Sequence, residues 1–518
     1  MYANSNGAPM LRRNTIADAF RRASRKFRNK LALTFLGRSW TFAELEQAAG
    51  RVAQALLDAG LQKGDRLASY GRNSDAYLIT WLACTRAGII HVPINYALTA
   101  GELRYIVEQS GASGLIYDAD LAATVDRIRN EVKVDTYGRF SASTSGELDV
   151  LAIAGDVGAP QLLDCLACET DLAQLLYTSG TTAAPKGAAM THGAFVAEYD
   201  ACIIELELRT SDVSLAALPL YHSAQMHCFS MPQLLMGATV HLIESPGPEI
   251  VLRLIEERHI TSFFAPPTVW ISLLRHPDFD KRELATLRSI FYGASIMPVP
   301  VLEELRQRLP GARPFNCYGQ SEIGPLATVL RPEEHDARPA SAGRPIVSVE
   351  TRVVDREMRD VPAGEQGEIV HRSPQLLVEY WGKPEETSEA FEGGWFHSGD
   401  VGYLDDEGYL YVVDRVKDII KSGGVVVAGR EVEDVLFKHP SVSEVAVIGL
   451  PDAKWIEAVT AVVVLRPESQ STEADLIAHA RGQLAAFKVP KRVIFTEKLP
   501  RNTAGKVLKR ELREHYAK

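Results

Sequence analysis

Short strand patterns alternate with amphipathic helix patterns through the first half of the chain, and this alternation limits the possible folds more than any other feature. The apolar spacing predicts strands at 66–70, 89–93, 115–117, 214–218 and 289–292, with a helix at 75–87 between the first two. Strands separated by helices pair in parallel, and helices then cover both faces of the sheet. We therefore expect an α/β fold in which parallel or mixed sheets are flanked by helices.

A second helix is predicted directly after Thr41. Thr41 and Glu44 have the spacing of a capping box, in which each side chain binds the backbone N–H of the other residue. Apolar residues then recur on one helical face until Gly60, which supplies a stop signal.

The pattern changes after about residue 340. Strands are predicted at 367–371 and 408–413, the second after a turn at 405–408, and they indicate a small antiparallel, barrel-like subdomain. From residue 417 the order is a helix at 431–438, strands at 445–449 and 459–465, and a helix at 473–485. We therefore expect a large N-terminal domain at 1–416 and a small α+β C-terminal domain at 417–518.

Composition narrows the class of protein. A chain of 518 residues needs more than one core, and its net charge of −10 argues against a general nucleic-acid-binding surface. No apolar run reaches the ~18–20 residues that span a bilayer, and no signal peptide is visible, so a cytoplasmic location is expected. Cys165 and Cys168 have C-x-x-C spacing without a second pair, which favours a structural role over a metal site.

A loop rich in hydroxyl groups is the first candidate functional element. It reads Tyr177-Thr-Ser-Gly-Thr-Thr-Ala-Ala-Pro-Lys-Gly187. Hydroxyls, backbone N–H groups and a lysine can surround a polyphosphate, although an ordinary surface loop has the same composition. It is not a Walker A loop, which needs Gly-Lys-Ser/Thr before a helix. The candidate nucleotide-binding residues are Thr178, Ser179, Gly180, Thr181, Thr182 and Lys186.

Six further motifs accompany this loop. They are Leu218-Pro-Leu-Tyr-His-Ser223, Tyr292-Gly-Ala-Ser-Ile-Met-Pro298, Asn316-Cys-Tyr-Gly-Gln-Ser-Glu322, Gly394-Trp-Phe-His-Ser-Gly-Asp400, Asp414-Arg-Val-Lys-Asp418 and Leu499-Pro-Arg-Asn-Thr-Ala-Gly-Lys-Val507. With the loop, the set resembles the adenylate-forming ligases, which include acyl-CoA synthetases, adenylation domains of peptide synthetases and luciferases. The resemblance extends from about residue 15 to about residue 515 in the family's order.

The resemblance implies a nucleotide site in the large domain. Tyr318 would lie near the adenine, Ser321 near a phosphate, and Glu322 would hold Mg²⁺, a hard cation that prefers carboxylate oxygens. Asp400 and Arg415 would bind the ribose. The remaining residues assigned to the nucleotide line the site mainly through their backbone: Gly293, Ala294, Ser295, Gly319 and Gln320.

The resemblance also implies roles on both sides of a domain hinge. Lys417 falls at the hinge of a mobile C-terminal domain, and Lys506 would approach the substrate carboxylate and the α-phosphate during adenylation. His222 would lie beside the acyl carboxylate. Ser422, Gly423 and Gly424 belong to the loop that enters the site for thioester formation.

The implied activity is acyl-CoA ligation in two steps. A carboxylic acid and ATP·Mg²⁺ give an acyl-adenylate, the C-terminal domain rotates, and the thiol of coenzyme A displaces AMP. Free coenzyme A is the favoured acceptor, with a separate acyl-carrier protein second. The linings near Gly293 and Ser223 suggest a bulky apolar acid. The oligomeric state is left open, with a homodimer as one option.

Three departures from the family pattern leave alternatives open. Ala183 replaces a glycine of the phosphate loop, Val425, Val426 and Ala428 replace polar positions after the hinge, and Ile456 replaces a usual glycine. One alternative is a specialised enzyme that is weak in adenylation and thioesterifies a pre-formed acyl-adenylate. Another is a degenerate nucleotide-binding protein, but the joint presence of Glu322, Asp400, Arg415 and Lys506 argues against it.

Overall fold

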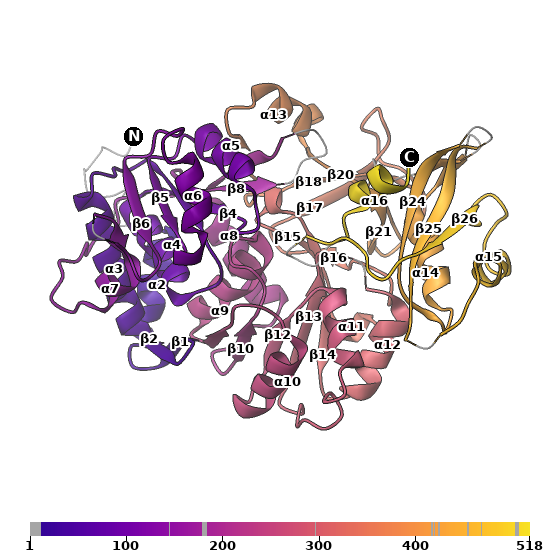
Figure 1. The fold of residues 1–518 in the computed structure, drawn as a ribbon, viewed down its shortest axis with the longest axis horizontal. Helices are drawn as coiled ribbons and strands as arrows, with labels where there is room; N and C mark the ends of the chain where they lie inside the picture. The colour runs from indigo at the N-terminus through magenta and orange to yellow at the C-terminus, as the bar shows by residue number, and fades with distance from the viewer. Residues whose placement is uncertain are drawn as a thin grey trace.

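The structure is a computed structural model that describes residues 12–144, 146–178, 184–295, 297–415, 418, 420–422, 425–452, 455–467, 469–502 and 507–517. Figure 1 shows two units of sheet and helices next to each other, coloured indigo to pink, with orange strands beside them. The gold C-terminal unit lies at the end of the molecule farthest from the N-terminal helices.

The first sheet is mixed and contains eight described strands in the order β19-β9-β8-β4-β3-β5-β6-β7. They are β3 (Arg66–Tyr70), β4 (Ile90–Ile94), β5 (Gly114–Tyr117), β6 (Thr136–Arg139), β7 (Leu148–Asp149), β8 (Leu172–Thr178), β9 (Lys186–Thr191) and β19 (Glu379–Tyr380). β3 pairs in parallel with β4 and β5. Helix α4 (Asp75–Ala87) connects β3 to β4 and is buried along its whole length, so the predicted β-α-β unit is confirmed.

The second sheet contains nine described strands in the order β16-β15-β14-β13-β12-β10-β11-β1-β2. They are β1 (Leu31–Phe35), β2 (Arg38–Thr41), β10 (Val213–Ala216), β11 (Thr239–Leu242), β12 (Ser262–Phe264), β13 (Ser289–Gly293), β14 (Arg313–Gly319), β15 (Leu326–Leu330) and β16 (Arg344–Pro345). From β1 to β14 the neighbours in this order are parallel, while β2, β15 and β16 are antiparallel. The expected mixed, largely parallel arrangement is therefore observed.

Helices cover these sheets. They are α2 (Ile16–Lys26), α3 (Phe42–Asp58), α5 (Ala100–Ser110), α6 (Ala122–Ile128), α7 (Val150–Gly155), α8 (His192–Glu205), α9 (Met231–Met236), α10 (Pro248–Glu257), α11 (Pro267–Arg275), α12 (Val299–Arg308) and α13 (Pro384–Ala390). The capping box before α3 is confirmed, because Thr41 Oγ1 accepts from Glu44 N at 3.3 Å and Glu44 Oε2 accepts from Thr41 N at 2.7 Å. Among the described residues, none of the helices has the length and apolarity needed to cross a membrane.

The antiparallel subdomain has the strand order β17-β18-β20-β21. Its strands are β17 (Glu350–Val354), β18 (Gly367–Arg372), β20 (Phe396–Leu404) and β21 (Leu410–Arg415). All neighbours are antiparallel, as predicted. β21 begins two residues later than expected, because Gly408 has a φ of +79° and belongs to the preceding turn.

The C-terminal unit is an α+β fold with its own core. It contains β22 (Ile420–Ser422), β23 (Val425–Val427), β24 (Val442–Asp452), β25 (Ile456–Leu465), β26 (Arg492–Phe495), α14 (Gly429–Phe437), α15 (Glu473–Arg481) and α16 (Lys509–Tyr516). Buried aliphatic side chains of α14 and α15 pack on this sheet, as expected from the helix–strand pattern. The domain boundary near residue 416 remains a prediction, since 416 and 417 lie outside the described residues.

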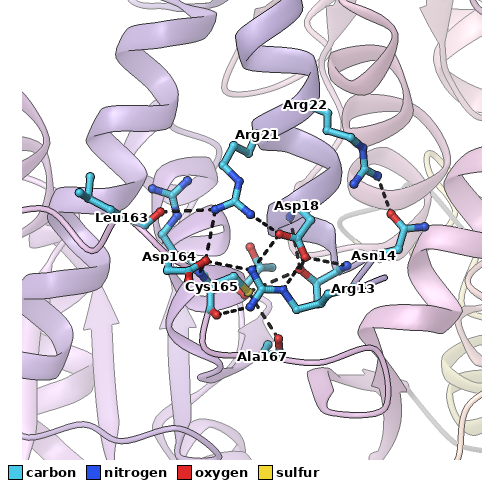
Figure 2. A network of polar contacts seen from close by, with 12 residues as sticks. Arg13, Asn14, Asp18, Arg21, Arg22, Leu163, Asp164, Cys165 and Ala167 are labelled. Carbon is cyan, nitrogen blue, oxygen red and sulfur yellow. Dashed lines mark hydrogen bonds and ion pairs between the residues drawn. The ribbon is translucent and has the colours of Figure 1, made fainter. Parts of the chain in front are cut away.

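A polar network attaches the N-terminal helix to a distant loop (Figure 2). Arg13 donates to Asp18 at 2.8 Å and to the carbonyl of Cys165 at 2.7 Å. The Cys165 thiol lies 3.4 Å from the Thr15 hydroxyl, and burial raises its pKa. Cys165 and Cys168 are both free thiols. The structural interpretation of the C-x-x-C spacing thus fits the contacts of Cys165.

Candidate active site

The predicted phosphate loop connects two neighbouring strands. β8 and β9 are antiparallel, and Thr178 pairs with Lys186 at the end of the ladder. Both residues therefore lie at the neck of the loop. The Lys186 ammonium is 5.1 Å from the centre of the Tyr380 ring, within cation–π distance. The neck thus presents a hydroxyl and a positive charge at the same edge of the sheet.

The Glu322 carboxylate lies against this neck. Glu322 belongs to a short 3₁₀ turn, η3 (Ser321–Ile323), and is 8% exposed. Its Oε1 accepts from the hydroxyl of Thr178 at 3.1 Å and from that of Tyr380 at 3.2 Å. A carboxylate surrounded by hydroxyl groups fits the oxygen ligands that Mg²⁺ prefers. The role of Glu322 as a metal ligand remains a prediction, and these contacts are compatible with it.

Tyr380 is a contributor that sequence reasoning missed. It lies in β19, whose two residues pair with Ala188 and Ala189 of β9. A strand this short has no apolar alternation, so no periodic signal marks it. Only the pairing with β9 brings the Tyr380 hydroxyl to Glu322.

The predicted acyl-side residues meet the Tyr-Gly-Gln-Ser-Glu motif through Ser223. The Ser223 hydroxyl lies 2.8 Å from the Ser321 hydroxyl. His222 precedes it and is half-buried. Because Ser223 follows β10 and Ser321 follows β14, the parallel second sheet brings the ends of both strands together.

Asn73 supports the segment that carries His222. Its side-chain amide donates to the carbonyl of Leu218 at 2.9 Å and accepts from Leu220 N at 2.7 Å. Asn73 is 4% exposed and follows β3 of the first sheet. One buried side chain therefore joins the two sheets directly beside the candidate acyl site. Sequence reasoning did not identify it, because both partners are backbone groups more than 140 residues away.

The two predicted ribose residues occupy opposite positions on neighbouring strands. Asp400 of β20 pairs with Arg415 of β21. The Tyr318 hydroxyl donates to Asp400 Oδ2 at 2.8 Å, and Asp400 is 4% exposed. Gln320 Nε2 reaches the carbonyl of Ser398 at 3.4 Å. The adenine and ribose motifs are therefore connected across two sheets.

Two glycines of the site are required by close backbone packing. A Cβ on Gly293 would lie 2.2 Å from the carbonyl oxygen of Cys317, and one on Gly319 would lie 1.8 Å from that of Pro325. After Gly293, Ala294 is exposed with a φ of +61°, and Ser295 is half-buried. β13 ends at Gly293, and Ala294 and Ser295 follow it directly.

Some of the remaining predicted site residues are described by the structure, and others are not. Ser422 is 2% exposed in β22 and pairs with Val425 and Ile456. Ile456 has a φ of +67° and is 65% exposed, so a β-branched residue occupies a conformation that suits glycine. Outside the described residues lie Ser179, Gly180, Thr181, Thr182, Ala183, Lys417, Gly423, Gly424 and Lys506, together with the side chains of Arg415, Val425 and Val426.

A buried carboxyl group supports the backbone that follows Glu322. Glu198 of α8 is fully buried, and its Oε1 accepts from Leu326 N at 3.0 Å. The Gln375 amide contacts Glu198 and also donates to the carbonyl of Ile323 at 3.1 Å. Burial raises the pKa of Glu198 to about 8 despite these hydrogen bonds. Sequence reasoning missed this residue, because it lies in the interior of a helix far from every motif.

Comparison with known proteins gives consistent matches. The family model of the AMP-binding enzymes matches residues 20–381, and that of the AMP-binding enzyme C-terminal domain matches residues 431–506. Feruloyl-CoA synthase from an Amycolatopsis species is 38% identical over 480 residues, which cover 93% of this chain and 94% of that enzyme.

Solved structures agree along nearly the whole chain. The anthranilate CoA ligase AuaEII, in complex with anthranoyl-AMP, has a TM-score of 0.91 at 27% identity and covers 97% of both chains. ATP-bound MatB from Rhodopseudomonas palustris has a TM-score of 0.89 at 32% identity, over 97% of this chain and 99% of that one. Apo MatB has a TM-score of 0.79. The described arrangement is therefore more similar to the ATP-bound form.

These relatives do not favour the specialised or the degenerate alternative. Two family models together match most of the chain. One relative is more than one third identical along almost its full length. All of these comparisons indicate the same family. The chain belongs to the AMP-binding enzymes and, within this adenylate-forming superfamily, to the acyl-CoA ligases.

Proposed function

We propose that this ligase activates a bulky, mainly apolar aromatic carboxylic acid and transfers its acyl group to coenzyme A. Thr178, Lys186 and Glu322 would bind the phosphates and Mg²⁺, and Tyr318 and Asp400 would bind the nucleoside. These roles rest on the hydrogen bonds of Glu322 with Thr178 and Tyr380, beside the Lys186 ammonium. The hydrogen bond with Thr178 joins the phosphate loop to the Tyr-Gly-Gln-Ser-Glu motif.

The chemistry is two displacements. In the first, a carboxylate oxygen of the substrate bonds to the α-phosphorus while the bond to pyrophosphate breaks. In the second, the coenzyme A sulfur bonds to the acyl carbon, AMP leaves with the bonding electron pair, and the thiol proton is lost to solvent. Bound Mg²⁺ would offset negative charge on the phosphate oxygens. Lys506 would offset charge on the α-phosphate, and Asp400 would hold the ribose by accepting from its hydroxyls.

The substrate class rests on the relatives. One is named for feruloyl-CoA and another for anthranilate, both aromatic acyl groups. The segment Leu218–Ser223, held by Asn73, contains the candidate acyl-carboxylate residue His222. An aromatic acid with one carboxylate would place its polar end at His222 and Ser223.

A panel experiment tests this proposal. Purified protein is incubated with ATP, Mg²⁺ and coenzyme A plus ferulate, anthranilate, indoleacetate, a long-chain fatty acid or malonate, and AMP and acyl-CoA are measured separately. We expect the highest kcat/KM with an aromatic acid and equal amounts of AMP and acyl-CoA. A clear preference for malonate or for the fatty acid would refute the aromatic class. Acyl transfer to a carrier protein but not to coenzyme A would refute the acceptor.

A further inference from the structure

A largely buried lysine lies where the C-terminal domain meets the antiparallel subdomain. Lys509 is the first residue of α16, and its side chain is 18% exposed. Its Nζ lies 2.9 Å from Glu433 Oε1 on α14. Glu433 Oε1 also accepts from Val447 N of β24 at 2.8 Å. Lys509 is therefore attached to the helix and the sheet of its own domain.

The opposite side of this cluster belongs to β21. Asp414, directly before Arg415, accepts from Gly429 N at 3.1 Å, and Gly429 begins α14. A Cβ built on Gly429 would lie 3.4 Å from Lys509 Nζ and 3.5 Å from Asp414 Oδ2. The ammonium and this carboxylate therefore approach the same point of α14 from two different domains.

The charges around Lys509 favour its protonated form. Burial lowers the pKa of the ammonium, but Glu433, Asp414 and Asp418 outweigh burial, so the pKa is raised. Two arginines of the same domain also pair with carboxylates here: Arg513 lies 2.7 Å from Asp418, and Arg430 lies 2.5 Å from Asp434 and 3.9 Å from Glu433. Loss of the Lys509 charge would remove one attraction that acts on both Glu433 and Asp414, which disfavours this arrangement.

Lys509 also follows directly after the loop that carries Lys506. A β-bridge between Arg501 and Val507 closes that loop, and Leu508 N donates to the carbonyl of Pro500 at 2.9 Å. Lys509 is the next residue. The Glu433 ion pair and the nearby Asp414 carboxylate therefore place the base of the Lys506 loop beside β21, which ends at Arg415.

We propose that Lys509 is a positioning residue that holds the C-terminal domain against β21 in the arrangement used for adenylate formation. This inference rests on the proposed two-step function. The similarity to the ATP-bound form of a relative supports the assignment to the first step. Rotation for thioester formation must separate Lys509 from Asp414, because the two residues lie on opposite sides of the hinge.

The test compares the two half-reactions in Lys509→Met, which removes the charge and keeps most of the side-chain length. We expect the rate of adenylate formation, measured by ATP–pyrophosphate exchange, to fall about tenfold. This is a typical size for coupling between distant sites. Thioester formation from supplied acyl-adenylate and coenzyme A should stay within about twofold of wild type. Lys509→Arg should restore most of the exchange. Arg510→Ala, on the exposed side of the same helix, is the matched control.

Asp414→Asn tests the interdomain attraction by itself, because it removes the charge on the β21 side and leaves the Lys509–Glu433 pair in place. It should reproduce the selective loss of exchange. Small-angle X-ray scattering gives a readout that does not depend on activity: the profile should change in Lys509→Met and Asp414→Asn but not in Arg510→Ala. Equal loss of both half-reactions, or an unchanged profile in Lys509→Met, would overturn the positioning role. Wild-type protein without either half-reaction would instead refute the proposed function.

Discussion

The N-terminal part of the site and the C-terminal domain are held in place in different ways. In the N-terminal part, Glu322 and Asp400 are buried and hydrogen-bonded to side chains from other elements. At the domain junction, Lys509 lies among the carboxylates of Glu433, Asp414 and Asp418. Interlocked side chains favour one geometry, whereas a small group of charges can separate and be hydrated again. This difference suits an enzyme in which one fixed site serves two steps.

The largest predicted effect comes from a substitution in the C-terminal domain. Lys506→Ala should lower adenylate formation by ~10²-fold or more, because a charged group that stabilises the transition state is lost. Conversion of supplied acyl-adenylate should be spared, since the proposed rotation would carry Lys506 out of the site. Rapid quenching of each half-reaction measures both rates, with the exposed Lys498→Ala as control. If both half-reactions fall together, Lys506 does not have this role.

The next prediction tests the fixed part of the site. Glu322→Gln should lower adenylation by about tenfold or more and raise the Mg²⁺ concentration needed for half-maximal rate, because a charged ligand is lost. The amide oxygen can still accept from Thr178 and Tyr380, so the free energy of unfolding should change little. A magnesium titration of exchange activity checks this, with Glu365→Gln, at an exposed position outside the site, as control. An unchanged magnesium dependence would remove Glu322 from the metal site.

A third prediction concerns Glu198, the buried carboxyl group that supports the backbone after Glu322. The pKa of Glu198 is about 8, against an ordinary value of 4.5, so between these pH values the folded chain keeps a proton that the unfolded chain has lost. Stability should therefore fall as pH rises through this window, by at most about 1.4 kcal/mol per pH unit. Urea unfolding from pH 7 to 8 measures this contribution as the difference in slope between wild type and a variant that lacks the carboxyl group.

Glu198→Gln should remove this downward contribution, whereas Glu257→Gln, at an exposed ion pair, should keep it. Burial lowers the pKa values of His91, His192 and His227, so these side chains are neutral in the folded state, while unfolded histidine loses its proton near pH 6.5. They therefore add a slope of opposite sign, which the comparison between the two proteins cancels. An identical slope in wild type and Glu198→Gln would mean that Glu198 is ionised in the folded protein.

The smallest predicted effect lies in the C-terminal domain. Ile456→Gly should raise the free energy of unfolding by about 0.5 kcal/mol, because relief of the left-handed strain slightly exceeds the added flexibility of glycine. Ile456→Ala is the control, since it removes the exposed side chain but keeps most of the strain. Calorimetry compares the three proteins. If alanine stabilises as much as glycine, the effect comes from the side chain and not from the backbone.

Much of the fold was predictable because its signals are local. The predicted strand at 66–70 and helix at 75–87 match β3 and α4, and Thr41 caps α3 as expected. Helix 473–485 was predicted too long: α15 ends at Arg481, ahead of Gly482. Local spacing identifies caps and apolar faces, but the last turn of a helix depends on packing.

The partners within the site were much less predictable. The motifs named Thr178, Tyr318, Glu322 and Asp400, but no pattern indicated that Glu322 meets Tyr380 or that Tyr318 meets Asp400. Such pairs join residues far apart in the chain, and sheet order decides them. Asn73, Glu198 and Lys509 were missed for the same reason, because their partners come from other elements.

ATP–pyrophosphate exchange without coenzyme A tests the central claim most directly. The claim is that the described site, joined by Lys506, forms an acyl-adenylate before any thiol is bound. We predict that an aromatic acid supports exchange of labelled pyrophosphate into ATP in wild type, and that added coenzyme A then gives acyl-CoA equal to the AMP released. Formation of acyl-CoA without any exchange in its absence, across the whole acid panel, would contradict the account.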